Sequence, residues 1–483
     1  MFNLHDYYAE SAVRGRMVEF LGGHRLEEAT CVYITADDCS SVMEFCPRGA
    51  AELWKCLDAG MEVKRSLWDR RSLVIHLDIE YVNFDYPAEP YLHPERSLGL
   101  QQPVIRLLQE RLLSHGISPL HLLSGRGHHL VWRIERSSPA FRVLSEIGMV
   151  PPTLAERYRS VQPPGEVVGL EAGRAFAGAG QMLEGLFGQV LRDGRASCSI
   201  PVQLSEVENG RGQRGREIVC LDLSEYGDPL DTRMVRIPFS AYHKPSQRRA
   251  ALGGHVVDEL PLLFMVPLFE ADERQGLFSM RNPRAIAELA RYASAEIPEQ
   301  NDGTARLVAA YTRSPTADFH RWFYSQEHEP PASWPETYDA TPLDDLPACV
   351  RRLLGQPNDA LLKPVGIRLL VRTFLALGWH PRHIAGLIRS KYERDHGWGN
   401  TFFLYDAATR ADFYTRMFAG LIAAKIDDLS DFTCEDLGST GLCRPDQCLE
   451  SLAPFRKSLE ERIRHDRLAC RPVHGLFLPD QHL

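Results

Sequence analysis

The sequence predicts an α+β protein, in which a first domain that mixes strands and helices precedes a mostly α-helical domain with clustered cysteines. Short apolar runs ending in acidic residues alternate with amphipathic segments over the first half of the chain. From residue 347 to about 426 the apolar residues recur at helical spacing. A proline-rich and acidic stretch, residues 326–347, lies before this change and is predicted to be a linker. The expected organisation is a first domain at 1–270, a helical connector and linker at 271–340, a cysteine-bearing domain at 341–455 and a charged tail at 456–483.

The composition is that of an ordinary soluble globular protein, with 44% apolar and 25% charged residues in a chain of 483. At about 150 residues per domain, roughly two to four domains are expected. No run of about 18 apolar residues occurs, which predicts that no segment spans a membrane. The first residues carry neither a basic nor an apolar signal region, so a cytoplasmic location is expected. A net charge of −9 neither predicts nor excludes nucleic-acid binding, because binding depends on local basic clusters.

The spacing of apolar residues predicts the elements of the first domain in order. The first seventy residues read as mostly helical. Strands are then expected at 73–77, 121–123, 129–132 and 218–221, and helices at 101–115 and 172–192. No Walker A sequence occurs, so no helicase or P-loop ATPase activity is expected from this chain.

An acidic pair, Asp78 and Glu80, continues the apolar run that begins at Leu73. A strand sends alternate side chains to opposite faces, so both carboxylates project from the same face. Two close carboxylates repel each other unless a cation lies between them, and Mg²⁺ prefers oxygen ligands that it shares with substrate phosphates. The pattern therefore predicts a divalent metal site. An ordinary strand with a solvated polar face is the alternative.

A glycine-rich segment at residues 124–129 reads Ser-Gly-Arg-Gly-His-His. Its glycines permit close approach of the backbone to a ligand, while Ser124, Arg126 and His129 offer donors to phosphate. The segment therefore predicts a phosphate contact. A plain hairpin turn is the alternative.

A third segment adds one carboxylate and two cations. Asp222 follows the strand expected at 218–221, and Arg236 and Lys244 come after it with charge suited to a triphosphate. Three carboxylates, a histidine and two cations meet the needs of nucleotidyl transfer, in which two metal ions stabilise the attacking and leaving oxygens.

The order of these motifs resembles the archaeo-eukaryotic primase superfamily, and most closely its small catalytic subunit. The motifs are Asp-x-Glu, then Ser-Gly-x-Gly-x-His, then Leu-Asp followed by Arg-x-Pro-Phe-Ser, and they cover roughly residues 60–250. The resemblance implies a primase-polymerase core with an RRM-like fold that uses Mg²⁺ or Mn²⁺. It implies that the metals are bound by three catalytic carboxylates and that the nucleotide phosphates are contacted by the glycine-rich motif: Asp78, Glu80 and Asp222 for the metals, and Ser124, Arg126 and His129 for the phosphates.

The last motif departs from the pattern of the family in one place. Relatives have Ser-x-His-x-Lys, whereas residues 240–244 here read Ser-Ala-Tyr-His-Lys and move the histidine by one position. Lys244 keeps its place, so its nucleotide-binding role carries over, and the role of His243 is in doubt.

Three cysteines, Cys434, Cys443 and Cys448, are spaced closely enough to share a metal. A tetrahedral zinc site or an iron–sulfur cluster needs a fourth ligand, for which Cys349, Cys470, His465 and His474 are the candidates. The spacing by itself favours zinc. Cysteines buried without a metal are the alternative.

This segment resembles the C-terminal domain of the primase large subunit, which holds a [4Fe–4S] cluster. The resemblance rests on Pro-x-Cys before a helical region, the segment at 368–378, and then Cys, Gly-Leu-Cys and Cys in order. It implies that Cys349, Cys434, Cys443 and Cys448 are the ligands, and the compressed final spacing keeps Zn²⁺ open. Since the domain helps to bind the initiating nucleotide and the template–primer end in this family, Arg368 and Arg372 are expected to contact phosphate.

Together the two resemblances imply a single-chain DNA primase or primase-polymerase. Its expected partners are a single-stranded DNA template, a primer strand and nucleoside triphosphates, with a separate helicase or replication, repair or defence proteins. One alternative is a polymerase of repair, of mobile elements or of CRISPR systems that extends primers without starting them. Another is a non-catalytic nucleic-acid-binding regulator with a structural or redox-sensitive iron–sulfur or zinc centre.

Overall fold

The computed structural model describes residues 3–37, 47–152, 154–155, 169–208, 212–228, 234–269, 272–355, 358, 360–393, 407–443, 448, 450–465 and 468. The chain divides into two compact units. Unit 1 comprises Met1–Gly180, Asp193–Leu204 and Gly210–Ala310, and unit 2 comprises Gln181–Arg192, Ser205–Asn209 and Tyr311–Leu483. Unit 1 mixes strands with helices, whereas the elements described in unit 2 are helices. The predicted α+β class is therefore confirmed.

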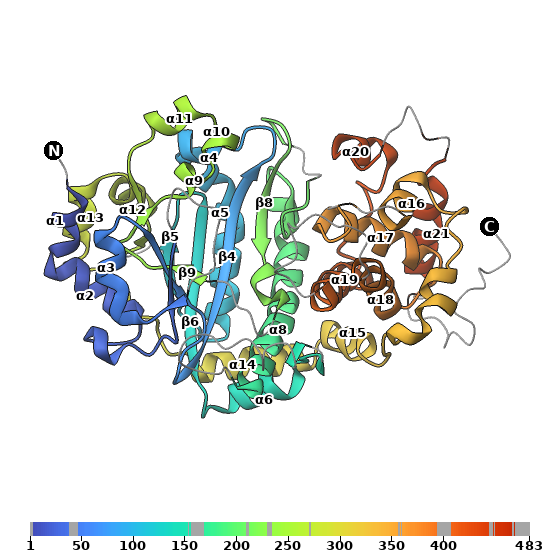
Figure 1. Ribbon diagram of the computed structural model, residues 1–483, viewed down its shortest axis with the longest axis horizontal. Coiled ribbons are helices and arrows are strands. Elements are labelled where there is room, and N and C mark those ends of the chain that lie inside the picture. Colours follow the sequence, from blue (N-terminus) through green and yellow to red (C-terminus); the bar gives the residue numbers. More distant parts are fainter. Residues whose placement is uncertain are drawn as a thin grey trace. The chain divides into compact units, whose positions relative to one another are not determined.

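A six-stranded sheet forms the core of unit 1 (Figure 1). Its order is β12-β5-β6-β4-β8-β7, and neighbouring strands are antiparallel except for the parallel pair β7 and β8. The strands are β4 (Ser72–Asn83), β5 (Leu120–Leu123), β6 (Gly127–Glu135), β7 (Val202–Leu204), β8 (Glu217–Asp222) and β12 (Val266–Pro267). Strand β4 pairs with β6 over residues 72–80 and with β8 over residues 78–83. The acidic pair therefore lies where β4 has a partner on both sides.

A second sheet, with the order β2-β1-β3-β9, differs from the helical prediction for the first seventy residues. That region holds α1 (Leu4–Ala9), α2 (Ser11–Phe20) and α3 (Leu53–Asp58), but also β1 (Ile34–Asp37), β2 (Pro47–Arg48) and β3 (Glu62–Ser66). Strand β3 pairs with β1 and with β9 (Met234–Arg236). Its sequence Glu-Val-Lys-Arg-Ser carries charges that ion pairs bury, so it lacks the alternating apolar pattern of a typical strand.

Helices cover the sheets of unit 1, and α5 packs on the face of the six-stranded sheet opposite the acidic pair. Two residues of α5 make hydrogen bonds to the sheet, Arg96 to the hydroxyl of Tyr81 and Gln109 to His121. Tyr81 and His121 project from the face opposite the acidic pair. The helices are α4 (Glu89–Leu92), α5 (Pro94–Ser114), α6 (Pro139–Ile147), α8 (Leu170–Gly194), α9 (Lys244–Gln247), α10 (Arg249–Leu252), α11 (Gly254–Glu259), α12 (Glu273–Met280), α13 (Pro283–Leu289) and α14 (Asn301–Thr312), with single 3₁₀ turns η1 (Leu26–Glu28), η2 (Ala50–Glu52), η3 (Arg195–Ser197) and η4 (Ser224–Gly227). Residues 181–192 of α8 and residues 311–312 of α14 belong to unit 2.

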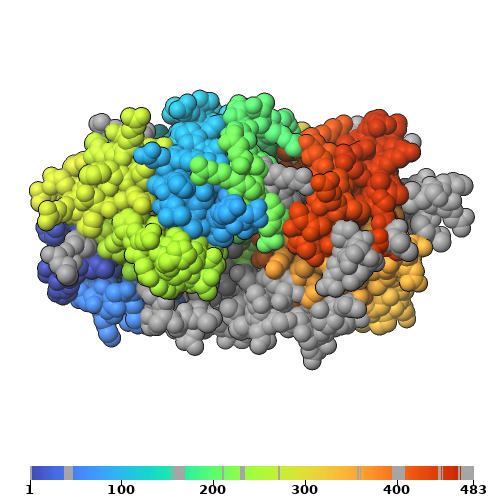
Figure 2. Space-filling view, turned by 90° about the horizontal axis from the view of Figure 1, so that it is seen from above, coloured from blue at the N-terminus to red at the C-terminus, as the bar shows by residue number. Residues whose placement is uncertain are grey.

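Helices α9 to α11 lie in the chain between two short strands, β10 (Ala241–Tyr242) and β11 (Leu263–Phe264). These two strands pair with each other in antiparallel orientation. Tyr242 is buried against Tyr91 of α4, with Leu252 and Leu263 in the same apolar cluster. Figure 2 looks onto this end of unit 1, where the blue segment after β4 and the yellow-green segment after β10 are neighbours on the surface.

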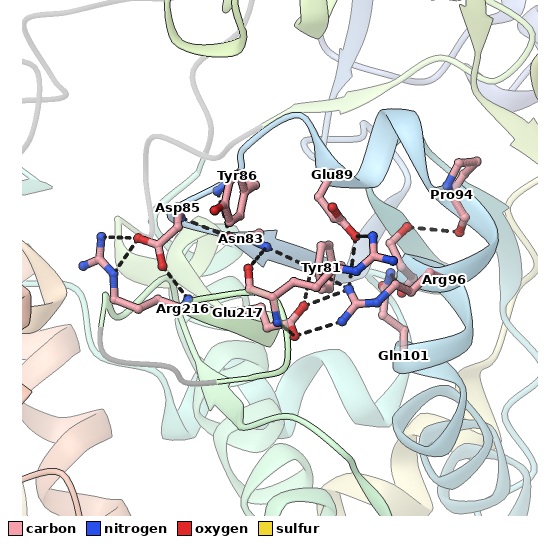
Figure 3. Close-up of polar contacts among 12 residues, drawn as sticks. Tyr81, Asn83, Asp85, Tyr86, Glu89, Pro94, Arg96, Gln101, Arg216 and Glu217 are labelled. Carbon is pink, nitrogen blue, oxygen red and sulfur yellow. Dashed lines mark hydrogen bonds and ion pairs between the residues drawn. The ribbon is translucent and has the colours of Figure 1, made fainter.

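Glu217 is the centre of a buried ion-pair network on the α5 side of β4 (Figure 3). Its carboxylate accepts hydrogen bonds from Arg96 at 2.8 and 2.9 Å and from the hydroxyl of Tyr81. The backbone amide of Arg214 donates to it at 3.1 Å. Arg96 also pairs with Glu89 at 3.3 Å. The network fixes the end of β4 that extends beyond the acidic pair.

We expect this network to make the free energy of unfolding fall in acid. Against the effect of burial, hydrogen bonds from Arg96 and Tyr81 lower the pKa of Glu217 to about 2. A depressed carboxyl pKa stabilises the fold above its unfolded value of about 4.3. This contribution is lost as the pH falls toward about 2. At pH 7, Glu217→Gln should cost about 2–3 kcal/mol in chemical unfolding, and its difference from wild type should shrink as the pH falls.

The matched control for Glu217 is Asp85→Asn, which removes the more exposed pair with Arg216 at 2.9 Å. A surface pair contributes little, so the control should stay within about 0.5 kcal/mol of wild type. A cost for Glu217→Gln that does not change with pH would show that the network does not act through the charge of Glu217.

Unit 2 is a bundle of helices that includes the stretch predicted to be a linker (Figure 1). Its helices are α15 (Pro315–Phe323), α16 (Ala348–Gly355), α17 (Pro364–Ala376), α18 (Pro381–Tyr392), α19 (Ala407–Ala423), α20 (Cys434–Ser439) and α21 (Ala453–Arg464), with 3₁₀ segments η5 (Pro331–Glu336) and η6 (Tyr338–Ala340). Trp334 and Tyr338 of the predicted linker are buried, and a Cβ on Gly386 of α18 would lie 2.1 Å from the Tyr338 hydroxyl. The aromatic side chains thus fix this proline-rich stretch within the unit. None of the helices in the described ranges is long and apolar enough to cross a lipid bilayer.

Candidate active site and cysteine cluster

Strand pairing brings the three predicted motifs of unit 1 together on one face of the six-stranded sheet. Asp78 is the direct partner of His129 on β6 and of Asp222 on β8. Glu80 pairs with Gly127 on the same side of β4. Directly opposite residues in a sheet project from the same face, so the two aspartates and the histidine are adjacent.

Asp78 is a partly exposed carboxylate whose Oδ1 atom is buried. Its Oδ1 atom accepts no hydrogen bond from any described residue and lies 3.5 Å from Nδ1 of His129. Burial and the nearby Asp222 carboxylate, against the opposing effect of His76, raise the pKa of Asp78 to about 6. Two carboxylates that repel each other at such a short range fit a divalent cation, because the ion supplies the positive charge that balances them.

Glu80 differs from the predicted ligand role in its contacts. Its carboxylate pairs with Arg126 and accepts from Nζ of Lys244 at 3.2 Å. Throughout the ranges that the structure describes, no three His, Cys, Asp or Glu side chains are arranged to hold a metal ion. Both of these cations belong to the other two motifs, and their positive charge attracts the carboxylate of Glu80. Glu80 thus links all three motifs by charge.

The glycine-rich turn at 124–127 packs tightly against β4. A Cβ on Gly127 would lie 2.0 Å from the carbonyl oxygen of Ile79, so only glycine fits there. Ser124 donates from Oγ to the carbonyl of Gly127 at 3.2 Å. Gln101 of α5 supports the turn from behind by donating to the carbonyl of Arg126 at 3.1 Å. The turn therefore holds Arg126 at the site and keeps Ser124 within the loop.

Arg236 and Lys244 both lie near His129, where their charges contribute to lowering its pKa after the larger effects of burial and His76. Glu62 of β3, which is fully buried, fixes this corner: it accepts from Nε of Arg236 at 2.8 Å and from the backbone amide of His243 at 2.8 Å. Burial and the Arg126 charge lower the pKa of Lys244 to about 8. His243, whose role was in doubt, contributes its backbone to this contact with Glu62.

In unit 2 the four predicted cysteines are neighbours. Burial and the thiols of Cys443, Cys434 and Cys448 raise the pKa of Cys349 to about 12. Glu450 connects the two ends of the set, because it accepts from the backbone amide of Ala348 at 3.1 Å and lies 3.5 Å from Sγ of Cys448. The four thiols are close enough to affect one another, but no three of them are arranged in the described residues to hold a metal ion, so a zinc ion or a [4Fe–4S] cluster would have to draw them together. Two other candidates for the fourth ligand, Cys470 and His474, lie outside the described residues.

Arg368 and Arg372 of α17, predicted to contact phosphate, are bound to carboxylates instead. Arg372 is buried and pairs with Asp427 at 2.6 Å and Asp431 at 2.6 Å. Arg368 pairs with Asp431 at 2.8 Å. Two aspartates thus neutralise the two arginines, and the network fixes the loop that leads to Cys434. In this arrangement both arginines position the cysteine segment.

Replacing Arg372 by Ala is expected to destabilise unit 2. The substitution leaves two carboxylates at a buried site without their main cation, which typically costs about 3–5 kcal/mol. Urea unfolding should show this loss. The matched control is Arg456→Ala, which breaks the exposed pair with Glu460 at 2.9 Å and should cost less than about 0.5 kcal/mol. Unchanged stability together with weaker nucleic-acid binding would restore the phosphate role.

Sequence reasoning missed the buried partners of the predicted residues. Glu62, His76 and Gln101 contact motif residues, and Glu225 contacts His76. Each of the four lies in an apolar or mixed stretch without a motif of its own. The signal that was available is an ionisable residue within a predicted strand, as at His76, two positions before Asp78. Comparison of the chain with protein-family models, with curated proteins and with solved structures finds no match.

Proposed function

We propose that the chain is a primase-polymerase of the archaeo-eukaryotic type, which makes short primers on single-stranded DNA from nucleoside triphosphates. The observation that carries the proposal is the pairing of Asp78 with Asp222 beside His129, with Arg236 and Lys244 near that histidine. A nucleotidyl-transfer site needs adjacent carboxylates with cations nearby, because the carboxylates bind metal and the cations bind the triphosphate.

In this proposal Asp78 and Asp222 hold Mg²⁺ or Mn²⁺, and Glu80 is the third carboxylate, as the primase resemblance implies. The ion, when bound, supplies positive charge where the attacking and leaving oxygens gain negative charge. Arg236 and Lys244 hold the outer phosphates, where charge accumulates as pyrophosphate leaves. Arg126 and His129 orient the triphosphate, so the protein acts by positioning and electrostatics rather than through a covalent intermediate.

The cysteine-bearing unit is proposed to aid initiation. Cys349, Cys434, Cys443 and Cys448 would hold a [4Fe–4S] cluster or Zn²⁺, which supplies a rigid crosslink among segments distant in sequence. Starting a chain requires two nucleotides to be held at once. A second unit on the same chain raises the effective concentration of the initiating nucleotide.

The test is synthesis by the full-length protein on single-stranded DNA with Mg²⁺ or Mn²⁺ and either ribo- or deoxynucleoside triphosphates. Dinucleotide and longer products without any primer are the expected result. Extension of a supplied primer without such products would make the chain a primer-extending polymerase. The absence of incorporation in both assays would contradict the enzymatic proposal and leave a nucleic-acid-binding regulator.

A further inference from the structure

His76 and Glu225 form a hydrogen-bonded chain that ends on His129, and no role in the motifs described above accounts for it. Glu225 Oε2 lies 2.6 Å from Nδ1 of His76, and Nε2 of His76 lies 2.7 Å from Nδ1 of His129. All three side chains are buried. The rings of His76 and His129 are 4.9 Å apart and inclined by 16°. Both histidines project from the sheet face that carries Asp78.

The segment after Asp222 holds His76 by its backbone as well. Strand β8 ends at Asp222, opposite Asp78, so its ladder with β4 does not reach His76. The hydroxyl of Tyr226 takes this place: it accepts from the amide of His76 at 3.0 Å and donates to its carbonyl at 2.9 Å. Tyr226 in turn stacks on Phe176 at 4.5 Å. One short turn, η4, therefore fixes both the backbone and the ring of His76.

The direction of the hydrogen bonds limits what His129 can do. An ionised carboxylate only accepts, so Glu225 keeps a proton on Nδ1 of His76. For Nε2 of His129 to donate to a phosphate oxygen, Nδ1 of His129 must accept in this bond and Nε2 of His76 must donate, so His76 carries a proton on both ring nitrogens beside the Glu225 carboxylate. The other ring nitrogen, Nε2, is the one that can meet a ligand. A partner on one imidazole nitrogen commonly sets the tautomer and orientation of the ring for the group bound at the other.

We propose that Glu225 and His76 are positioning residues that hold His129 with Nε2 toward the triphosphate of the incoming nucleotide. The proposal rests on the proposed function for the identity of the ligand. It adds two residues that act through His129 without touching the substrate. Losing either one should free the ring of His129 to rotate, which weakens nucleotide binding more than it slows the chemical step.

The test combines nuclear magnetic resonance of the nucleotide-free protein with steady-state kinetics. Selective ¹⁵N-histidine labelling reports the tautomer of His129, which is assigned by its loss in His129→Gln. In Glu225→Ala and His76→Ala the ¹⁵N shifts of His129 should change, and KM for the nucleotide should rise about 10-fold to 100-fold with a smaller change in kcat. Glu225→Gln keeps an acceptor for Nδ1 of His76 and should restore most of the affinity.

A matched control exists in the same sheet. His121 and the buried His128 form another histidine pair, with Nε2 and Nδ1 2.9 Å apart, on the opposite face of the sheet. His121→Gln should leave both KM and the His129 signals unchanged. Thermal unfolding separates misfolding from misorientation in every variant, and Glu225→Gln serves as the informative variant if an alanine variant does not fold.

The outcomes separate failure of this inference from failure of the proposed function. If wild type incorporates nucleotides while Glu225→Ala alters neither the His129 signals nor KM, the positioning role is wrong and the function stands. If wild type neither incorporates nucleotides nor binds an α,β-methylene triphosphate analogue with Mg²⁺, the proposed function and the ligand named here both fail.

Discussion

Asp78→Ala and Asp222→Asn should each lower nucleotide incorporation by about 10³-fold or more, on the order of the loss seen when electrostatic stabilisation is removed from an active site. The physical reason is the pairing of these carboxylates across β4 and β8, where Oδ1 of Asp78 is buried without a hydrogen bond from a described residue. Each variant removes one carboxylate of the proposed cation site. The measurement is product formed per enzyme over a range of Mg²⁺ and Mn²⁺ concentrations.

Stability is expected to move in the other direction. In the presence of a chelator the two carboxylates repel each other, so Asp222→Asn should raise the free energy of unfolding by about 1 kcal/mol. A gain in stability together with a loss of activity indicates a pair kept for function. Asp85→Asn, at the exposed end of the same segment, is the control and should change neither quantity. Full activity in Asp78→Ala would contradict the proposed active site.

Cys434→Ser should remove the bound metal or cluster and abolish primer initiation while leaving extension of a supplied primer. Cys349, Cys443 and Cys448 are its thiol partners in unit 2, and a zinc ion or a cluster that loses one of four sulfur ligands is held much more weakly. The loss should appear as missing visible absorbance and missing iron after anaerobic purification. Zinc in place of iron would keep the site but change its occupant.

The control for the cysteine cluster is Cys198→Ser, since Cys198 is a partly exposed thiol of unit 1. It should retain the metal, initiation and extension. Equal loss of initiation and extension in Cys434→Ser would show that the cysteine segment supports the whole fold rather than the start of synthesis. A wild-type protein that contains neither iron nor zinc would contradict the cofactor proposal.

The sequence predicts local elements well where apolar spacing is regular, and it predicts partners across the sheet less well. The strand carrying Asp78 and Glu80 was visible as an apolar run, and it extends from Ser72 to Asn83. The pairing of Asp78 with Asp222 joins segments more than a hundred residues apart. No local pattern encodes that register, and the sequence predicts only that the three motifs share one site.

Buried charges account for most of what could not be predicted. Glu62 and Arg236 pair at 2.8 Å within a sheet whose strands look polar in sequence. Arg372 looked available for phosphate because Asp427 and Asp431 lie far along the chain. A charged residue reads as solvated unless its partner is known, and partners are set by tertiary structure. Trp334 and Tyr338 are buried although the prolines around them predict a linker.

Alternate residues of strand β4 serve two purposes, one on each face of the sheet. Val74, His76, Asp78 and Glu80 lie on one face, and Ile75, Leu77, Ile79 and Tyr81 on the other. A saturation library of this strand should therefore show two interleaved patterns of tolerance. From His76 to Glu80 the even positions should reject changes of functional group, and the odd positions should reject changes of volume. Deleting a single residue would exchange the two sets at once, so this stretch of the gene should accept substitutions far more readily than changes of length.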